Sequence, residues 1–253
     1  MKGMSVTQRA KAVKQPRGGY IPLRMMEKTE YYDGKVLGEE NVSPSVVGLA
    51  VDYLTRMELT GDREKAFEIS MYGATRLGRK KEGLGYLEGI TGLDDGSVRN
   101  ACRLVWFDTF VRSGQIIGDP MDNNADENTC ENIRTMVERT TSFFEKAGPV
   151  MMVCPTFLGG YSDTVVLGDG DLATKDTLWD IKTSKNSPKS TDTLQMAMYW
   201  IMGRRSVHPE LIGLDSIGIY NPRLNMSYTL DMRAVSRETI EAIERDVICY
   251  RSC

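Results

Sequence analysis

The chain has 253 residues, of which 41% are hydrophobic and 26% are charged, and its formal net charge is −3 at pH 7. These proportions are ordinary for a folded globular protein and exclude a mainly disordered or fibrous chain. No apolar run reaches the roughly 20 residues that cross a bilayer, and the N-terminal sequence lacks the apolar centre of a signal peptide. We therefore expect a cytoplasmic protein that is not inserted in a membrane.

Cysteine and histidine are too scattered for the common metal sites. The five cysteines contain no C-x-x-C pair, which favours free thiols over a disulfide framework or a zinc site. The single histidine, His208, precedes Pro209, and one histidine excludes a multi-histidine metal site. A bound metal ion would therefore have to use carboxylate ligands.

The first part of the chain is basic, whereas the remainder is acidic. Residues 1–28 contain seven Lys or Arg residues and one acidic residue, Glu27, so a net +6 there leaves −9 for the rest. We treat residues 1–42 as a basic N-terminal arm. Such an arm contacts nucleic acid, contacts an acidic face of a partner or of a second copy of the chain, or is only solvated. The sequence leaves these alternatives open.

Helical patterns dominate the next segment. Ser43 followed by Pro44 is typical of a helix start with serine as the N-cap. Apolar residues then recur at helical spacing in three stretches, and glycines interrupt the chain between the last two. We predict helices at 43–57, 62–77 and 97–112, and with them a helical N-terminal lobe over 43–124.

From residue 125 onward the pattern becomes mixed. Helical spacing alternates with short stretches that are rich in β-branched and aromatic residues and are bounded by turn residues. We predict helices at 129–147, 190–203 and 236–250, and strands within 150–167 and at 177–184, 214–220 and 226–232. This order indicates a mixed α/β core over 125–253, in which helices flank a sheet.

Charged side chains are expected to meet on two of these strands. Alternation in the strand at 178–184 places Asp180 and Lys182 on the same face. A hairpin that pairs 161–167 with 178–184 would bring Asp163 beside Asp180. Two adjacent carboxylates repel each other unless a divalent cation lies between them. The pattern therefore predicts a Mg²⁺ site.

The helix that follows carries two further polar candidates. Gln195 and Tyr199 lie one turn apart on one helix face, where they either overlook the strand end or pack in the core. Two clusters of basic residues either contact phosphate groups or are wetted surface: Lys185 and Lys189, which precede this helix, and Arg79, Lys80 and Lys81 in the helical lobe.

These motifs resemble those of the PD-(D/E)XK nuclease superfamily, in particular its RecB-like and phage-exonuclease-like branch. The resemblance is carried by Gly160-x-x-Asp163, by Asp180-Ile181-Lys182-Thr183 and by Gln195-x-x-x-Tyr199, and the run from Ile219 to Arg223 is similar to a later strand of that branch. It covers about 40 residues closely. It implies a restriction-endonuclease-like core sheet flanked by helices.

The resemblance also implies an activity and a role for each residue. Asp163, Asp180 and the Ile181 carbonyl would hold Mg²⁺ or Mn²⁺, and Lys182 would assist the attacking water. Gln195 and Tyr199 would position the nucleic acid strand or the lysine. The implied activity is divalent-metal-dependent hydrolysis of DNA, of the exonuclease type. It depends on Asp163 and Asp180 lying close enough to share one ion.

Departures from the family keep two alternatives open. A histidine in the early helical region and a glutamate in the strand before Gly160 are missing, and Glu131, Glu138 and Glu145 are expected to face solvent instead. One alternative is a catalytically weak or inactive protein of nuclease fold that binds nucleic acid or a protein partner, as a phage-type inhibitory factor does. The other is RNA as the substrate, because nothing here reads a 2′-hydroxyl.

Overall fold

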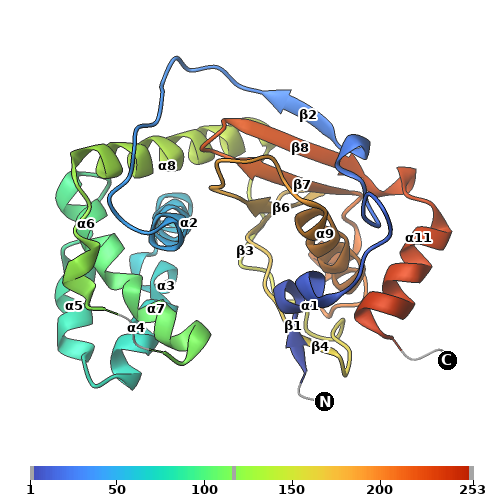
Figure 1. The fold of residues 1–253 in the computed structure, drawn as a ribbon, viewed down its shortest axis with the longest axis horizontal. Helices are drawn as coiled ribbons and strands as arrows, with labels where there is room; N and C mark the ends of the chain where they lie inside the picture. The colour runs from blue at the N-terminus through green and yellow to red at the C-terminus, as the bar shows by residue number, and fades with distance from the viewer. Residues whose placement is uncertain (1–2, 116–117, 251–253) are drawn as a thin grey trace. The chain divides into compact units, whose positions relative to one another are not determined.

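The computed structural model describes residues 3–115 and 118–250, and the chain divides into two compact units. Unit 1 contains Met1–Tyr31 and Phe144–Cys253, and unit 2 contains Tyr32–Phe143. Figure 1 follows the chain from its blue N-terminus through unit 2 to its red C-terminus. Unit 1 is therefore assembled from two segments that are far apart in the sequence.

Unit 1 is built on a six-stranded mixed sheet with the strand order β2-β8-β7-β6-β5-β3. Strands β6 and β7 are parallel, and every other neighbouring pair is antiparallel. The strands of this sheet are β2 (Glu27–Glu30), β3 (Met152–Val153), β5 (Leu172–Ala173), β6 (Thr177–Ile181), β7 (Ser216–Asn221) and β8 (Met226–Asp231). The expected mixed α/β architecture is confirmed at this level.

Helix α9 (Ser190–Gly203) makes the crossover between the parallel strands β6 and β7. Its buried residues share one hydrophobic cluster with Leu178 of β6 and with Ile217 and Ile219 of β7. On β6, Trp179 packs against Gly218 of β7, where an added Cβ would lie 2.3 Å from the indole ring. The helix therefore fixes the position of strand β6, which carries the predicted site residues.

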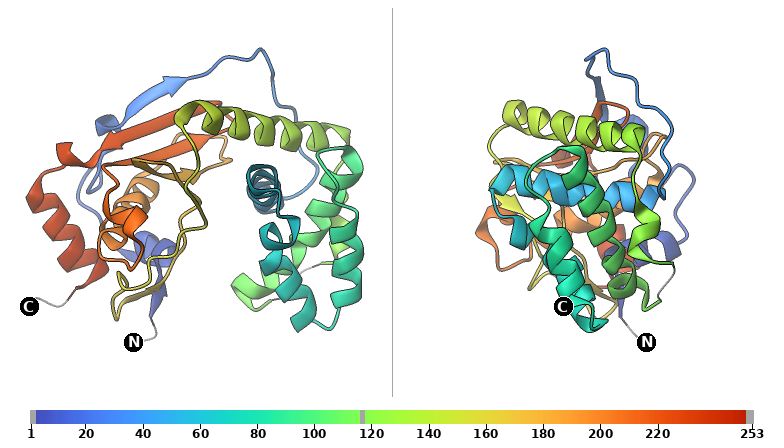
Figure 2. Two further views of the ribbon diagram at one scale, coloured as in Figure 1. Left: turned by 180° about the vertical axis from the view of Figure 1, so that it is seen from behind. Right: turned by 90° about the vertical axis from the view of Figure 1, so that its left-hand side faces the viewer.

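Residues 3–31 belong to unit 1, so the prediction of a separate arm over 1–42 is wrong. Strand β1 (Met4–Ser5) pairs in parallel with β4 (Val165–Leu167), and β2 extends the main sheet beside β8. Helix α1 (Val6–Ala12) begins at a capping box formed by Ser5 and Gln8. Figure 1 and the left view of Figure 2 show α1 lying beside α9. Non-local strand pairing and burial of Val6 override the local charge pattern.

Unit 2 is helical, as predicted, and it has its own hydrophobic core. Ser43 caps the first helix through its side chain, as the Ser-Pro pair predicts. The helices are α2 (Pro44–Thr60), α3 (Arg63–Ala66), α4 (Glu68–Arg76), α5 (Lys80–Glu88), α6 (Asp95–Leu104), α7 (Trp106–Ser113), the short 3₁₀ turn Pro120–Asn123, and α8 (Glu127–Ala147), whose last turn lies in unit 1. The expected boundaries at 43–124 and 125–253 therefore differ from the observed division.

Helix α8 explains that difference. Its apolar stripe, which includes Ile133, Met136 and Val137, is buried in the core of unit 2, whereas the sequence pattern assigns it to the α/β core. Glu138 on the opposite side is exposed, as are Glu131 and Glu145, in agreement with the prediction. Periodicity identifies which face of a helix is buried but does not identify the unit that buries it.

The remaining elements complete unit 1. They are the 3₁₀ turns Leu23–Met25 and Met232–Ala234, α10 (Pro209–Ile212), α11 (Arg237–Ala242) and a π-helical turn, Ile243–Ile248. The last two elements replace the single helix predicted at 236–250. Within residues 3–115 and 118–250, no helix is long and apolar enough to cross a membrane.

Candidate active site

The C-terminal end of β6 carries a buried carboxylate. Asp180 is 3% exposed, and the Nζ of Lys182 lies 2.8 Å from its Oδ2. From α9, Gln195 Nε2 donates to Asp180 Oδ1 at 3.1 Å. The alternation of β6 and the crossover of α9 thus bring three predicted site residues together.

Tyr199 joins the same cluster from the next turn of α9. Its hydroxyl accepts a hydrogen bond from Gln195 Nε2 at 3.2 Å, and it also interacts with the Thr7 hydroxyl of α1. The Tyr199 ring stacks on Phe157, with ring centroids 4.9 Å apart. Tyr199 is therefore both a core residue and a member of the polar cluster. The two alternatives for its position, packing in the core and facing the end of the strand, are both observed.

A second carboxylate reaches this cluster from β5, and it belongs to Asp171. Strands β5 and β6 pair Leu172 with Trp179, so Asp171 stands opposite Asp180 one position further along the ladder. Asp171 Oδ2 accepts a hydrogen bond from the Ile181 amide at 2.7 Å. The sequence contains a signal for this residue, because Gly168-x-x-Asp171 repeats the spacing of Gly160-x-x-Asp163.

Asp163 is not part of this cluster. The expected hairpin between 161–167 and 178–184 is wrong, because β4 pairs with β1 and the hairpin partner of β6 is β5. Gly160, the first residue of the predicted motif, packs against α9, where an added Cβ would lie 2.0 Å from the Met202 carbonyl oxygen. That glycine therefore has a packing role.

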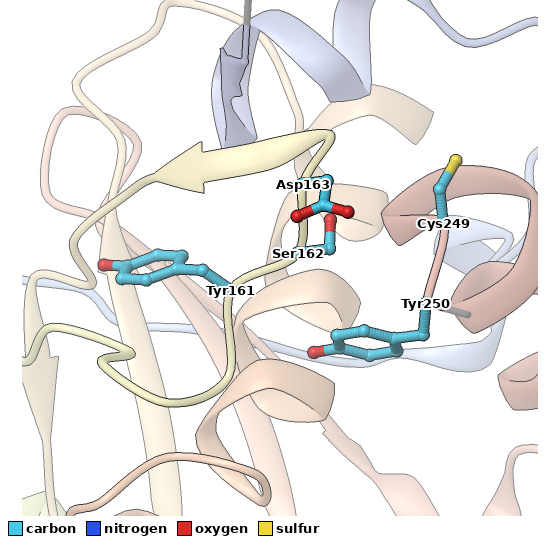
Figure 3. A pocket seen from close by; sticks show the side chains of 5 residues that line it. All are labelled: Tyr161, Ser162, Asp163, Cys249 and Tyr250. Atoms are coloured by element: carbon cyan, nitrogen blue, oxygen red, sulfur yellow. The ribbon is translucent and has the colours of Figure 1, made fainter. Parts of the chain in front are cut away.

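Asp163 instead lines a shallow pocket of about 300 Å³ (Figure 3). The pocket is lined by Tyr161, Ser162, Asp163, Cys249 and Tyr250. Its three hydroxyl groups are already engaged: Tyr161 donates to the Gly168 carbonyl, Ser162 to the Ile248 carbonyl and Tyr250 to the Gly160 carbonyl. The bonds of Ser162 and Tyr250 tie the 157–164 loop to the C-terminal turn, so the pocket wall has a structural role.

Burial is the largest influence on the pKa values of the cluster. Burial raises the pKa of Asp180 to about 7; the Lys182 ammonium opposes this shift, and Asp171 reinforces it. Burial lowers the pKa of Lys182, but the charges of Asp180 and Asp171 outweigh that cost and raise the pKa above its ordinary value. Lys182 is therefore a stable cation, whereas Asp180 can gain or lose a proton near neutral pH.

One oxygen of Asp180 lacks a properly aligned donor. Oδ2 is buried and makes no hydrogen bond, although the Lys182 ammonium lies 2.8 Å away. We attribute the difference to angle, since an ion pair requires proximity and a hydrogen bond also requires alignment. A buried carboxylate oxygen in this state is costly. A hard cation bound by Asp180, Asp171 and the Ile181 carbonyl would relieve that cost.

The donor set for a metal ion is small. In the described part of the chain, no three His, Cys, Asp or Glu side chains form a group that could hold a metal ion. Two carboxylates and one carbonyl suit Mg²⁺ or Mn²⁺, which retain several water ligands, better than zinc. The residues present therefore fit such an ion with water completing its coordination.

The segment after β6 is held in place by the end of β7 and the turn that follows it. Asn221 Nδ2 donates to the Ser184 carbonyl at 2.8 Å, and Arg223 Nε donates to the Thr183 carbonyl at 2.6 Å. The Asn221-Pro222-Arg223 run thus fixes the chain that leaves Lys182. Lys185 and Lys189, further along this loop, are exposed.

In the basic run Arg79-Lys80-Lys81 of unit 2, the arginine is paired with acidic residues. Arg79 pairs with Glu82 at 2.5 Å and with Asp119 at 3.1 Å, and its guanidinium lies over the Trp106 ring. The charge of Arg79 is neutralised and its plane is covered, so the structure argues against phosphate binding by this residue. Lys80 and Lys81 are exposed on α5.

Comparison of the chain with family models, with curated proteins and with solved structures gives no match. The site is therefore interpreted from its own geometry.

Proposed function

We propose that this protein is a divalent-metal-dependent nuclease that hydrolyses phosphodiester bonds in DNA. The observation that carries the proposal is the buried cluster at the end of β6, in which Asp180 faces a second carboxylate, Asp171, and a permanent cation, Lys182. A buried carboxylate beside a like charge is costly for folding and is typical of sites that bind and activate a ligand.

Each residue has a role that follows from its contacts. Asp180, Asp171 and the Ile181 carbonyl would hold Mg²⁺ or Mn²⁺, which supplies Lewis-acid stabilisation of the phosphate and a more acidic bound water. Lys182 stays protonated, so it stabilises negative charge on the phosphate by its own charge and by donating hydrogen bonds. Gln195 donates to Asp180 and holds the carboxylate in orientation.

A nuclease assay tests this proposal. Purified protein is incubated with single-stranded DNA, duplex DNA or RNA, in Mg²⁺, in Mn²⁺ or in chelator. We expect metal-dependent cleavage of DNA that Lys182→Ala abolishes. Lys175→Ala is the matched control, because Lys175 is exposed in the turn at the opposite end of β6. Cleavage that persists in Lys182→Ala, or that is insensitive to chelator, would contradict the proposal.

A second candidate function is a nuclease-like protein that binds nucleic acid without cleaving it. It is favoured by the small donor set, since the described residues contain no group of three metal-binding side chains. Binding of DNA in chelator together with no cleavage in Mg²⁺ or Mn²⁺ would select this function over hydrolysis.

A further inference from the structure

The N-terminal segment, which carries several basic residues, packs against the helix that contributes Gln195 and Tyr199 to the candidate active site. The side-chain amide of Gln15 donates to the Ser190 carbonyl at 3.1 Å, and the Thr193 hydroxyl donates to the Ile21 carbonyl at 2.6 Å. Ser190 is the first residue of α9 and directly follows Lys189. Hydrogen bonds therefore hold the segment 15–21 against the start of α9, where the loop that carries Lys185 and Lys189 ends.

Helix α1 connects the same segment to the centre of the cluster. Thr7 interacts with the Tyr199 hydroxyl, and Lys11 lies four residues later, on the same face of α1 and about 6 Å further along its axis. Lys14 and Arg17 follow beyond the end of the helix. These three basic residues thus follow Thr7 in order along the N-terminal segment.

These cations are not neutralised within the protein. Lys11, Lys14 and Arg17 are exposed and form no ion pair with any residue that the structure describes. Several other basic residues are paired, as in Arg56 with Asp52 and Arg134 with Asp95. Isolated exposed cations repel one another and attract a polyanion, and the gain on binding comes from released counterions.

We propose that Lys11, Lys14 and Arg17, together with Lys185 and Lys189, form a track that binds the phosphate backbone of the nucleic acid strand leading to the Asp180 cluster. The inference rests on the proposed function for the identity of its ligand. The track supplies affinity and position, and it carries no sequence information because its contacts are to phosphate. It assigns a function to the basic segment, whose role the charge pattern alone leaves open.

Binding measurements in chelator test the track independently of hydrolysis. The dissociation constant for a fluorescent 20-nucleotide single strand and for a 20-base-pair duplex is measured between 50 and 200 mM salt. Each lost phosphate contact lowers the slope of log affinity against log salt by roughly 0.7 for a single strand and 0.9 for a duplex. The triple variant Lys11→Ala/Lys14→Ala/Arg17→Ala should therefore lose roughly 2 to 3 from the slope and bind about 10- to 100-fold more weakly at 50 mM salt.

Two matched proteins separate charge from folding. Lys11→Arg/Lys14→Arg/Arg17→Lys keeps the charge and should keep the slope, while Lys65→Ala/Lys146→Ala/Lys175→Ala removes the same charge from exposed positions elsewhere and should also keep it. An unchanged slope in the first triple variant overturns the inference. So does equal competition by poly-glutamate of matched charge, which would indicate an acidic protein segment as the ligand.

The outcomes also separate this inference from the proposed function. A wild-type protein that cleaves DNA, with a triple variant that keeps the full salt slope, refutes the track alone. If the salt slope falls in the triple variant but the wild-type protein cleaves no substrate in Mn²⁺, the track is supported and the nuclease proposal is refuted. A wild-type protein that binds neither nucleic acid refutes the track.

Discussion

Asp108 in unit 2 and Asp180 in unit 1 are both buried carboxyl groups, and they differ in what surrounds them. Both oxygens of Asp108 accept hydrogen bonds, one from the Ser70 hydroxyl and one from the Tyr53 hydroxyl at 2.5 Å, and Arg112 lies 3.6 Å away. Asp180 has one oxygen without an aligned donor and faces a second carboxylate. Burial raises the pKa of both groups.

The contrast separates a structural carboxylate, Asp108, from the carboxylate that we propose to be functional, Asp180. Both oxygens of Asp108 accept hydrogen bonds from hydroxyl groups, with the Arg112 guanidinium beside one of them, and such partners make a buried polar group tolerable. The surroundings of Asp180 leave its Oδ2 without an aligned hydrogen-bond donor and place the carboxylate of Asp171 nearby. A raised pKa alone would select both residues, so the hydrogen-bond partners carry the distinction.

The largest effect is expected from Asp171, which the sequence analysis does not select as a site residue. Asp171→Asn removes one of the two carboxylates at the cluster, and we expect the rate of metal-dependent DNA cleavage to fall on the order of 100- to 1000-fold. Asp163→Asn is the matched control, since Asp163 lies in the pocket of Figure 3, and its rate should stay within about twofold of wild type. A larger loss of cleavage rate in Asp163→Asn than in Asp171→Asn would show that Asp163, and not Asp171, belongs to the active site.

Substitution of Asp108 should lower stability and leave cleavage intact, the opposite of what we expect for the Asp180 cluster. Asp108→Asn leaves a buried hydroxyl of Ser70 or Tyr53 without an acceptor, because the amide nitrogen cannot accept its hydrogen bond. We expect the free energy of unfolding in urea to fall by about 1 to 3 kcal/mol, with DNA cleavage retained at a temperature where the variant is folded. Loss of cleavage in folded Asp108→Asn would show that unit 2 contributes directly to activity.

The raised pKa of Asp180 should be measurable as a pH dependence of the free energy of unfolding. Its folded pKa of about 7 lies above the ordinary value of 3.8, so between these values the folded protein holds a proton that the unfolded chain has lost. Its contribution to stability therefore grows as pH falls through 7. In chelator, lowering the pH from 8 to 5.5 should stabilise wild type by roughly 2 kcal/mol more than Asp180→Asn.

The titration of Asp108 is present in both of these proteins and cancels in the comparison. Identical pH dependence of the unfolding free energy in wild type and Asp180→Asn would show that Asp180 is not the raised carboxyl group.

The smallest effect is expected at the edge of the cluster. Tyr199→Phe removes the hydroxyl that accepts from Gln195, while Gln195 keeps its bond to Asp180. We expect DNA cleavage to slow about 2- to 10-fold, which corresponds to about 1 kcal/mol. Tyr250→Phe, which loses a hydroxyl bonded to the Gly160 carbonyl, serves as its control and should cleave at the wild-type rate.

Local signals predict much of this fold. Ser43 before Pro44 gives the start of α2, and period-two alternation places Asp180 and Lys182 on one side of β6. The four-residue spacing of Gln195 and Tyr199 gives their shared face on α9. Each of these features depends on residues close together in the sequence.

The errors arise where distant segments meet. Two G-x-x-D spacings, ending at Asp163 and Asp171, are equivalent as patterns, and the choice depends on which strand pairs with β6. The tight turn in which the Thr174 amide donates to the Thr177 carbonyl makes β5 that strand. Likewise, positive charge marks the N-terminal segment, but the non-local pairings of β1 with β4 and of β2 with β8 attach it to unit 1.

Calorimetric titration with Mn²⁺ at pH 8 tests the central claim most directly, namely that Asp171 and Asp180 together hold a divalent cation. We predict one bound Mn²⁺ per chain for wild type and for Asp163→Asn, and no binding at the same concentrations for Asp171→Asn or Asp180→Asn. Equal binding by all four proteins, or binding by none of them, would contradict the claim.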